Sequence, residues 1–130
     1  MHSFDRARER PAPLELTGVT LEGAPWSRPL RRITLVVAVK PDCDGCTDFV
    51  AGDIGDLSHL DVVVVSSHTN DQWRAQHRAV LVAPALLEQL QISSAPFYVL
   101  IDALRGRVVG EGSVFSPAQV AQEIAPFFAP

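Results

Sequence analysis

The sequence predicts an α/β sandwich in which one mixed β-sheet, with parallel pairing at its centre, is covered by helices on both faces. Two buried strands indicate the centre of this sheet: Ile33–Val39 is rich in β-branched residues, and Asp61–Ser66 contains four consecutive valines. Apolar residues at helical spacing lie between them, so the segment is typical of a βαβ unit with a right-handed crossover. The length of 130 residues suits a single domain.

The composition excludes several classes of protein. The chain is 47% hydrophobic, 20% charged and 7% aromatic, which is typical of a globular protein and not of a disordered or fibrous one. Apolar runs such as Leu35–Val39 are far shorter than the roughly 20 residues that span a bilayer. The net charge of -4 disfavours nucleic acid as a partner, because phosphate binding requires clustered Lys and Arg.

The N-terminal residues are charged and contain no apolar segment of the kind that secretory signals carry. We expect residues 1–13 to form a flexible segment and residues 14–130 to fold as one domain. As the sequence stands, it predicts a cytoplasmic location with no membrane span. An extracytoplasmic location is the alternative if a signal or membrane anchor precedes this sequence in a longer form.

The elements on either side of the βαβ unit follow from alternation, helical spacing and turn residues. Leu14–Leu16 and Val19–Leu21 predict an N-terminal hairpin turning at Thr17-Gly18, and residues 23–32, which contain Gly23, Pro25 and Pro29, predict a loop. The later elements are expected in this order: helical character over Asn70–Ala79, a strand at Val80–Val82, a helix at Ala85–Gln91 opened by Pro84, a strand at Phe97–Ile101 and a hairpin arm at Arg107–Val114.

A terminal helix completes the predicted fold. Ser116 and Pro117 resemble an N-cap and a first helical position, and Gln119 follows three residues after the serine. The helix is expected to bury Val120, Ile124 and either Phe127 or Phe128.

The chemistry-bearing motif is Cys43-Asp44-Gly45-Cys46, placed where the first buried strand passes into a helix. The helix is indicated by Cys46, Phe49, Val50, Ile54 and Leu57 on one face, although Gly52 and Gly55 weaken that prediction. A thiol at a helix N-terminus meets unpaired N–H groups and the positive end of the dipole, which favour the thiolate. We expect Cys43 to attack a partner disulfide and the more buried Cys46 to resolve the mixed disulfide.

With these elements, the chain resembles the thioredoxin-like superfamily over nearly its whole length, and most closely the TlpA/ResA-type branch. The resemblance implies a three-layer α/β/α sandwich with an N-terminal β-hairpin extension and thiol-disulfide exchange without a cofactor. It also implies that Pro96, in Ser93-Ser94-Ala95-Pro96-Phe97, is a cis-proline and that the backbone of Ala95 pairs with an extended substrate segment. The alternative is a trans-proline at the start of an edge strand.

The chain departs from the family pattern around the cysteines. Asp42 replaces the common tryptophan, Asp44-Gly45 replaces Gly-Pro, and Asp48 follows on the same helix. Residues 41–73 hold seven aspartates and no Lys or Arg. Nearby carboxylates oppose thiolate formation, so Asp42 and Asp44 are candidate tuning residues; capping and dipole complementation are the alternative roles. Val37 occupies the strand position where thioredoxins carry a buried acid, which also predicts a less reactive nucleophile.

Other types of site are less well supported. Cys43, Cys46 and His68 resemble a copper-carrying variant of the same fold, but such proteins have one more residue between the cysteines; no metal site is predicted. A zinc ribbon is excluded because the sequence has no second Cys-x-x-Cys motif. The sequence also lacks a peroxidase motif, a Gly-x-Ser-x-Gly nucleophile elbow and a phosphate-binding loop. Trp26 and Trp73 are expected to pack in the core or at its rim.

Two functional hypotheses remain. The first is a thiol-disulfide oxidoreductase that acts on a protein disulfide or dithiol, with Cys43 and Cys46 catalytic and Ala95 and Pro96 contacting the substrate. Its acidic surroundings predict a partner with a basic patch. The second is a protein-interaction module on the same fold, with cysteines that are redox-silent or bind a metal.

Overall fold

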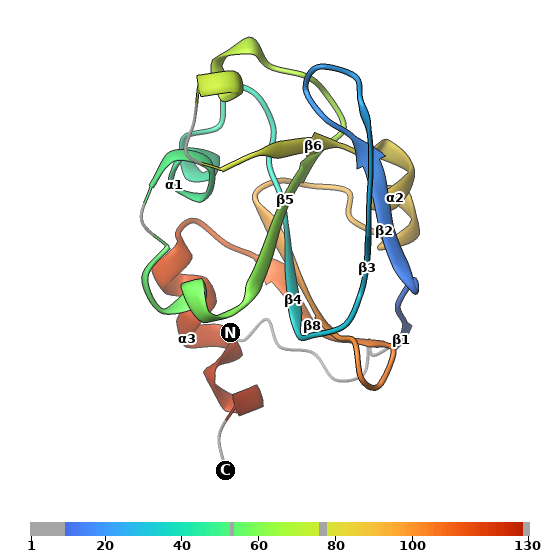
Figure 1. Cartoon of the computed structure of the whole chain (residues 1–130). Helices are drawn as coiled ribbons and strands as arrows, with labels where there is room; N and C mark the ends of the chain where they lie inside the picture. The colour runs from blue at the N-terminus through green and yellow to red at the C-terminus, as the bar shows by residue number, and fades with distance from the viewer. Residues whose placement is uncertain (1–9, 53, 76–77, 129–130) are drawn as a thin grey trace.

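The computed structural model describes residues 10–52, 54–75 and 78–128, which form a mixed sheet of eight strands (Figure 1). The strands are β1 (Arg10–Pro11), β2 (Glu15–Val19), β3 (Pro25–Pro29), β4 (Thr34–Ala38), β5 (Asp61–Ser66), β6 (Val80–Val82), β7 (Phe97–Asp102) and β8 (Arg107–Ser113). Their order in the sheet is β1-β8-β7-β4-β5-β6-β2-β3. The helices are α1 (Asp44–Ala51), α2 (Pro84–Gln89) and α3 (Pro117–Phe128), with 3-10 turns η2 (Gly55–His59) and η3 (Asp71–Ala75).

The centre of the sheet confirms the predicted βαβ unit. Strand β4 pairs in parallel with β5, and β5 pairs in parallel with β6. On its other side, β4 pairs antiparallel with β7, which in turn pairs antiparallel with β8. Four residues connect the carboxyl end of β4 at Ala38 to Cys43, so the two cysteines lie beyond this end of the central strand.

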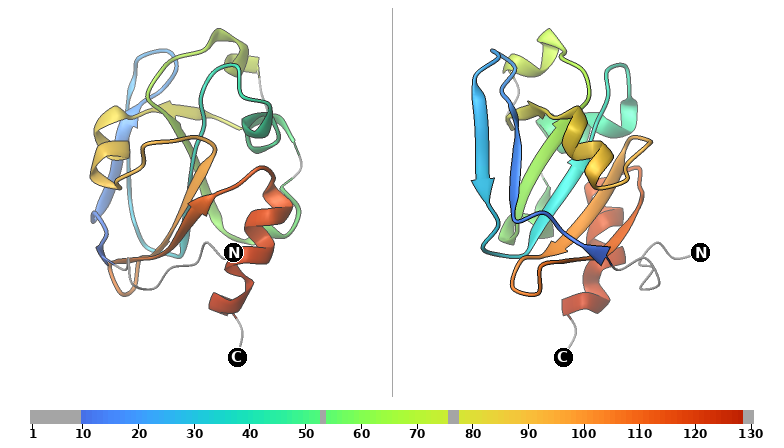
Figure 2. Two further views of the ribbon diagram at one scale, coloured as in Figure 1. Left: turned by 180° about the vertical axis from the view of Figure 1, so that it is seen from behind. Right: turned by 90° about the vertical axis from the view of Figure 1, so that its right-hand side faces the viewer.

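Each face of the sheet carries its own apolar core because side chains alternate along a strand. Leu35 and Val37 belong to a cluster with α1, η2 and α3, whereas Val36 and Ala38 belong to a cluster with α2. The sheet therefore lies between two helical layers, as predicted. Figure 2 shows the β2–β3 hairpin on one side of the molecule and α3 on the other.

The N-terminal hairpin exists, but its predicted turn was wrong. Residues 17 and 18 lie inside β2, and the turn forms instead where Thr20 and Gly23 share a backbone hydrogen bond of 2.9 Å. Gly18 suits a close approach of strands, because a Cβ there would lie 2.9 Å from Ala83 Cβ. The predicted loop 23–32 contains β3, whose prolines are tolerated because β3 is an edge strand.

The helix that follows Cys43 is shorter than its apolar spacing predicts. Helix α1 ends at Ala51, and the same core receives Ile54 from the N-cap position of the 3-10 turn η2 and Leu57 from the turn itself. Arg78 stabilises the end of α1, since its guanidinium donates to the carbonyl oxygens of Phe49 and Gly52 at 3.2 and 2.9 Å. Neither contact has a sequence pattern that would predict it.

Helix α3 follows its sequence signals, whereas α2 ends at Gln89 instead of Gln91 and the helical segment predicted over residues 70–79 is the shorter 3-10 turn η3. The Ser116 hydroxyl accepts a hydrogen bond from the Gln119 backbone N–H at 3.1 Å, as an N-cap does. Val120 and Ile124 are buried, whereas Phe128 is 40% exposed. Trp73 is buried and Trp26 is half-buried.

The chain joins the sheet before residue 14. Residues 1–9 of the segment expected to be flexible lie outside the described residues, but Arg10–Pro11 forms β1 and pairs with β8. Arg10 also donates to Glu111 at 2.8 Å. Among the helices in the described residues, none has the length and hydropathy needed to cross a bilayer.

Candidate active site

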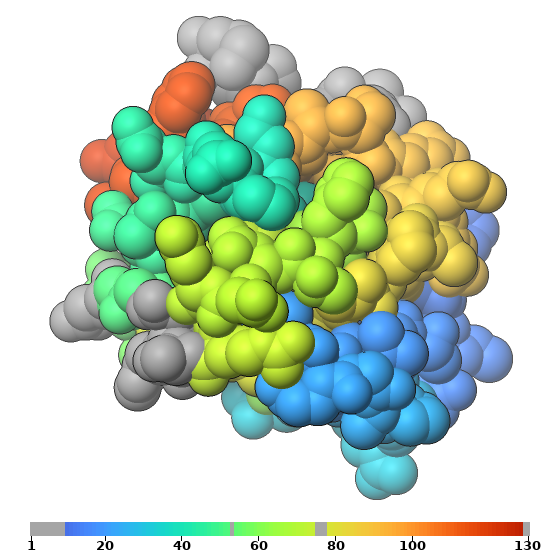
Figure 3. All heavy atoms as spheres, turned by 90° about the horizontal axis from the view of Figure 1, so that it is seen from above, coloured from blue at the N-terminus to red at the C-terminus, as the bar shows by residue number. Residues whose placement is uncertain are grey.

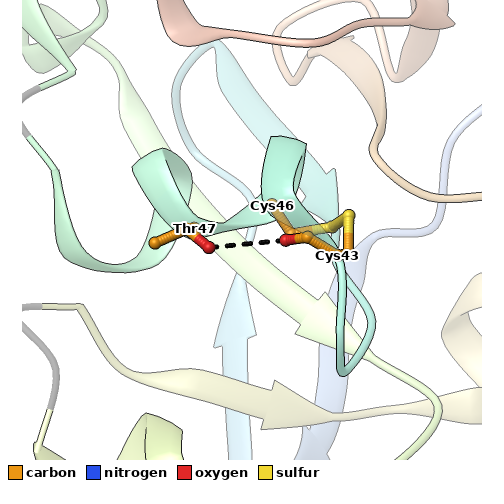
Figure 4. The surroundings of a disulfide bond; sticks show 3 residues. All are labelled: Cys43, Cys46 and Thr47. Atoms are coloured by element: carbon orange, nitrogen blue, oxygen red, sulfur yellow. Dashed lines mark hydrogen bonds between the residues drawn. A yellow bond between two sulfur atoms is a disulfide. The ribbon is translucent and has the colours of Figure 1, made fainter.

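Cys43 and Cys46 form a disulfide at the N-terminus of α1, with their Cα atoms 5.3 Å apart (Figure 4). Cys43 occupies the N-cap position, and its carbonyl oxygen accepts hydrogen bonds from the Cys46 N–H at 3.1 Å and the Thr47 hydroxyl at 3.4 Å. Cys43 is half-buried, but Cys46 is only 2% exposed. A partner sulfur can therefore reach Cys43 more readily than Cys46.

The residue before the first cysteine adopts a backbone conformation that few residue types tolerate. Asp42 has a φ of 56°, in the left-handed region, where Asn and Asp are among the more acceptable residues after glycine. The chain reverses at this residue, and Cys43 then returns to extended geometry as the helix begins. Asp42 thus has a conformational role at the site besides any effect of its charge.

The segment containing Pro96 lies against the disulfide loop. The Ala95–Pro96 peptide bond is cis, and a Cβ added to Gly45 would lie 3.2 Å from Pro96 Cγ. The Pro96 carbonyl oxygen accepts a 3.3 Å hydrogen bond from the Val114 N–H. The structure therefore places Pro96 next to Gly45, one of the two residues between the cysteines.

Ala95 has free backbone groups at the same place. Within the described part of the chain, neither the N–H nor the C=O of Ala95 has a hydrogen-bond partner. The residue is half-buried and packs against both apolar clusters. An extended polypeptide next to the disulfide would satisfy these groups, as strands do when they add to an open edge.

A groove of about 550 Å³ begins at Ala95 and continues between the end of β4 and α2. Its polar wall contains Lys40, His68, Glu88 and the hydroxyls of Ser93 and Ser94. Figure 3 looks onto this end of the molecule, where the segment after β5 (yellow-green) lies between the Cys43 region (teal) and the α2 region (gold). His68, a predicted minor candidate, lines this groove, and its Nδ1 is 2.8 Å from Ser67 Oγ.

The charges next to the disulfide are exposed carboxylates. Asp42, Asp44 and Asp48 are all exposed, and Asp44 lies in the first turn of α1. None of the three has an ion-pair partner among the residues that the structure describes. On the sheet beneath, Val37 is fully buried in the cluster that packs against α1, so an apolar side chain stands where thioredoxins carry an acid.

A metal site is not assembled at the cysteines. Across residues 10–52, 54–75 and 78–128, no three His, Cys, Asp or Glu side chains come together in a geometry that would hold a metal ion. The cysteines are bonded to each other, and His68 lies on the groove wall.

Sequence reasoning missed one prominent feature of the site. Phe115 is 76% exposed, and its carbonyl oxygen and Cα lie 3.6 and 3.7 Å from the position of a Cβ at Gly45. Its place directly before the Ser116 N-cap was the only available signal, and that position alone does not predict whether a side chain points inward or outward. An aromatic ring therefore stands on the surface beside the disulfide.

Solved structures with similar folds cover nearly the whole chain. The thioredoxin domain of a thiol-disulfide oxidoreductase from Bacteroides vulgatus shares 16% identity, with a TM-score of 0.62 and 99% of each chain covered. A thioredoxin family thiol:disulfide interchange protein from Chlorobium tepidum shares 22% identity, with a TM-score of 0.61, 96% of this chain and 100% of that chain covered. A secreted disulfide oxidoreductase from Mycobacterium tuberculosis shares 15% identity, with a TM-score of 0.60, 87% of this chain and 96% of that chain covered.

The chain has a thioredoxin-like fold. At these identities, the likeness concerns the fold, and it agrees with the mixed sheet and the N-terminal strands described above. No family model matches the sequence, and comparison with curated protein sequences finds no match. Within this thioredoxin-like fold, the Cys43–Cys46 pair lies at the carboxyl end of a central strand, where ligands of open α/β sheets gather.

Proposed function

We propose that this protein is a thiol-disulfide oxidoreductase that exchanges electrons between its Cys43–Cys46 pair and a disulfide or dithiol of another protein. The observation that carries the proposal is the Cys43–Cys46 disulfide at the N-terminus of α1, with Pro96 against the intervening Gly45. The thiol-disulfide oxidoreductases with similar folds support the same reaction type.

The reaction consists of two sulfur exchanges. In the reducing direction, the Cys43 thiolate attacks one sulfur of the partner disulfide, and the other partner sulfur leaves as a thiolate that takes a proton from solvent. The Cys46 thiolate then attacks Cys43 Sγ, which re-forms the Cys43–Cys46 bond and releases the second partner thiolate. The pair loses two electrons and the partner disulfide gains them; the reverse sequence oxidises a partner dithiol.

The two cysteines have different roles because their exposures differ. The half-buried Cys43 can receive a partner sulfur, whereas Cys46, at 2% exposure, is accessible mainly to Cys43. The N-terminus of α1 favours a thiolate on Cys43, and the carboxylates of Asp42 and Asp44 disfavour it. We infer that Asp42 and Asp44 make Cys43 a less reactive nucleophile and attract partner proteins with a basic patch.

The substrate is proposed to bind as an extended polypeptide at Ala95 and Pro96. The unpartnered backbone of Ala95 and the 550 Å³ groove that begins there support a polypeptide over a small thiol. The wall of Lys40, His68 and Glu88 offers polar contacts to side chains that flank the substrate cysteine.

The reaction is proposed to take place outside the cytoplasm. The structurally similar M. tuberculosis protein is secreted, and protein disulfides persist in such oxidising compartments. The redox state of Cys43–Cys46 in cells, measured by rapid acid quenching and alkylation, tests this part. A fully reduced pair would favour the cytoplasmic alternative.

Trapping of a mixed disulfide tests the exchange reaction. Cys46→Ser should capture a partner protein on Cys43 as an adduct that reductant releases, because the resolving thiol is missing. Cys43→Ser is the matched control and should capture nothing. If Cys46→Ser captures no partner and the wild-type protein reduces no disulfide substrate, the oxidoreductase proposal fails and the redox-silent interaction module is favoured.

A further inference from the structure

A second surface lies near the disulfide and shares no lining residue with the Ala95 groove. Helix α3 packs against η2 (Figure 1), and a hollow of about 710 Å³ lies between α3, η2 and Asp48 of α1. Its apolar wall comes from Ile54 and from alanines of α3, including Ala121 and Ala125. A smaller hollow of about 280 Å³ shares Ala121 and Ala125 and ends at Phe128. We call the two together the α1–α3 seam.

Phe115 stands at the disulfide end of the seam. It directly precedes Ser116, which lines the larger hollow, and its backbone lies next to Gly45 between the two cysteines. A side chain that is 76% exposed leaves most of an aromatic ring in water. Exposed aromatic residues at the end of an apolar groove are typical of protein contacts, where they contribute a large share of binding energy.

The seam is also acidic. Asp48 and Asp56 line the larger hollow, and no Lys or Arg lines either hollow in the described residues. Neither aspartate has an ion-pair partner within that part of the chain. Their charges therefore face the seam without compensation, and a ligand that supplies positive charge would complement them.

We propose that the α1–α3 seam binds a Lys- or Arg-containing segment that flanks the reactive cysteine of the partner polypeptide, with Phe115 as its apolar contact. This inference rests on the proposed oxidoreductase function and names the chemistry of its partner. The ten residues from Ser116 to Ala125 span a rise of about 14 Å along the axis of α3, enough for about four residues of extended chain. In Figure 3 the Cys43 region (teal) lies between α3 (red-orange) and the α2 region (gold), so one polypeptide that crosses the disulfide can contact both the seam and the Ala95 groove.

Disulfide peptides that differ only in one flank provide the test. A core peptide is compared with versions that carry four additional residues on either side of the cysteine, either Lys-Ala-Lys-Ala or Glu-Ala-Glu-Ala. We expect one Lys-containing version to have a kcat/KM about tenfold above the core peptide at low salt, with the advantage shrinking at high salt. The Glu-containing versions should have no advantage.

Two variants test whether the advantage of the Lys-containing peptides depends on the α1–α3 seam. Phe115→Ala should remove most of the roughly tenfold advantage, and Asp48→Asn combined with Asp56→Asn should reduce it about threefold. The matched controls are Leu104→Ala, which removes a side chain that is 89% exposed on another surface, and Glu15→Gln, which neutralises an exposed acid on β2. Both controls should keep the full advantage.

The outcomes separate this inference from the proposed function. If the Lys-containing peptides are no faster than the core peptide, or if the seam variants keep the full advantage, the seam is not the binding surface. Exchange with the core peptide would then leave the oxidoreductase function intact. If no peptide undergoes exchange, both the proposed function and this inference fail.

Discussion

Carboxylates in two regions of the molecule, β8 and the start of α1, show how burial decides what a charge does. Glu111 on β8 has 4% of its side chain exposed and is paired with Arg10 at 2.8 Å, while Arg10 also donates to the Leu90 carbonyl oxygen at 2.7 Å. Asp42 and Asp44 at the disulfide are exposed and have no ion-pair partner in the described residues. The buried carboxylate of Glu111 therefore links distant parts of the chain, whereas the exposed carboxylates at the disulfide face solvent.

The difference is one of solvation. A buried charge is no longer hydrated, so removal of its counter-charge strongly destabilises the folded protein. An exposed carboxylate keeps its water and contributes little to folding, but its field still acts on a neighbouring thiolate or an approaching partner. We therefore expect changes at Arg10–Glu111 to alter stability, and changes at the disulfide to alter exchange.

The largest effect is expected at Glu111. Glu111→Gln should lower the free energy of unfolding by about 3 kcal/mol, because the largely buried Arg10 then loses the carboxylate that it contacts at 2.8 Å. Urea denaturation measures this loss, and the exchange rate per folded molecule should not change. The control Glu15→Gln, at an exposed position of β2, should stay within about 0.5 kcal/mol of wild type. Equal losses in the two variants would remove the proposed distinction between the regions.

The next largest effect is expected at Gly45, on the rate of exchange and without a loss of stability. Gly45→Ala places a Cβ 3.2 Å from Pro96 Cγ, so the Pro96 segment must shift by a few tenths of an ångström next to the disulfide. We expect exchange with a peptide to fall about tenfold. Stability should stay level or rise by up to about 1 kcal/mol, because alanine is a better helix former than glycine. The control is Gln89→Ala, at an exposed position of α2, which should leave the exchange rate unchanged. If Gly45→Ala also exchanges at the wild-type rate, the contact between Gly45 and Pro96 has no role in exchange.

A polar group at a helix terminus should have an intermediate effect on stability. Ser116→Ala removes the hydroxyl that accepts from the Gln119 N–H, and the expected cost is about 1 kcal/mol. Ser113→Ala, an exposed serine at the end of β8, serves as the control and should cost much less. Chemical denaturation of the two variants compares them directly. A similar cost for both would show that the cap contributes little.

The smallest effect on stability is expected at Asp42. Asn also tolerates the left-handed conformation, so Asp42→Asn changes the charge with little strain and should alter stability by less than about 0.5 kcal/mol. Removal of the negative charge should lower the pKa of the reduced Cys43 thiol, because the thiolate loses a like-charged neighbour. The exchange rate would then persist to lower pH than in wild type. The ultraviolet absorbance of the thiolate against pH measures the shift, and a raised pKa would contradict the tuning role.

Local sequence patterns predicted the centre of the fold and the position of its cysteine pair. Asp61–Ser66 forms β5 with the predicted bounds, and the Cys-x-x-Cys spacing placed both sulfurs at the start of α1. These features depend on residues close together in the sequence, so their physical causes are visible there. The position of Pro96 next to the cysteines depended instead on a resemblance to known folds.

Contacts between distant segments could not be predicted in the same way. Arg10 and Glu111 are separated by 101 residues, and no periodicity relates them. Strand β3 was missed because its prolines are typical of a loop, and only its edge position in the sheet makes them acceptable. The exposure of Phe115 likewise depends on how the β8–α3 connection passes Gly45.

A redox equilibrium titration tests the central claim most directly. The protein is equilibrated in dithiol buffers of graded potential, and the oxidised fraction of Cys43–Cys46 is read by alkylation and mass spectrometry. The proposed function predicts a reversible two-electron transition between about -270 and -120 mV, the span from thioredoxin to strongly oxidising members of this fold. If no intramolecular disulfide forms at any potential, the pair is redox-silent and the proposed function is wrong.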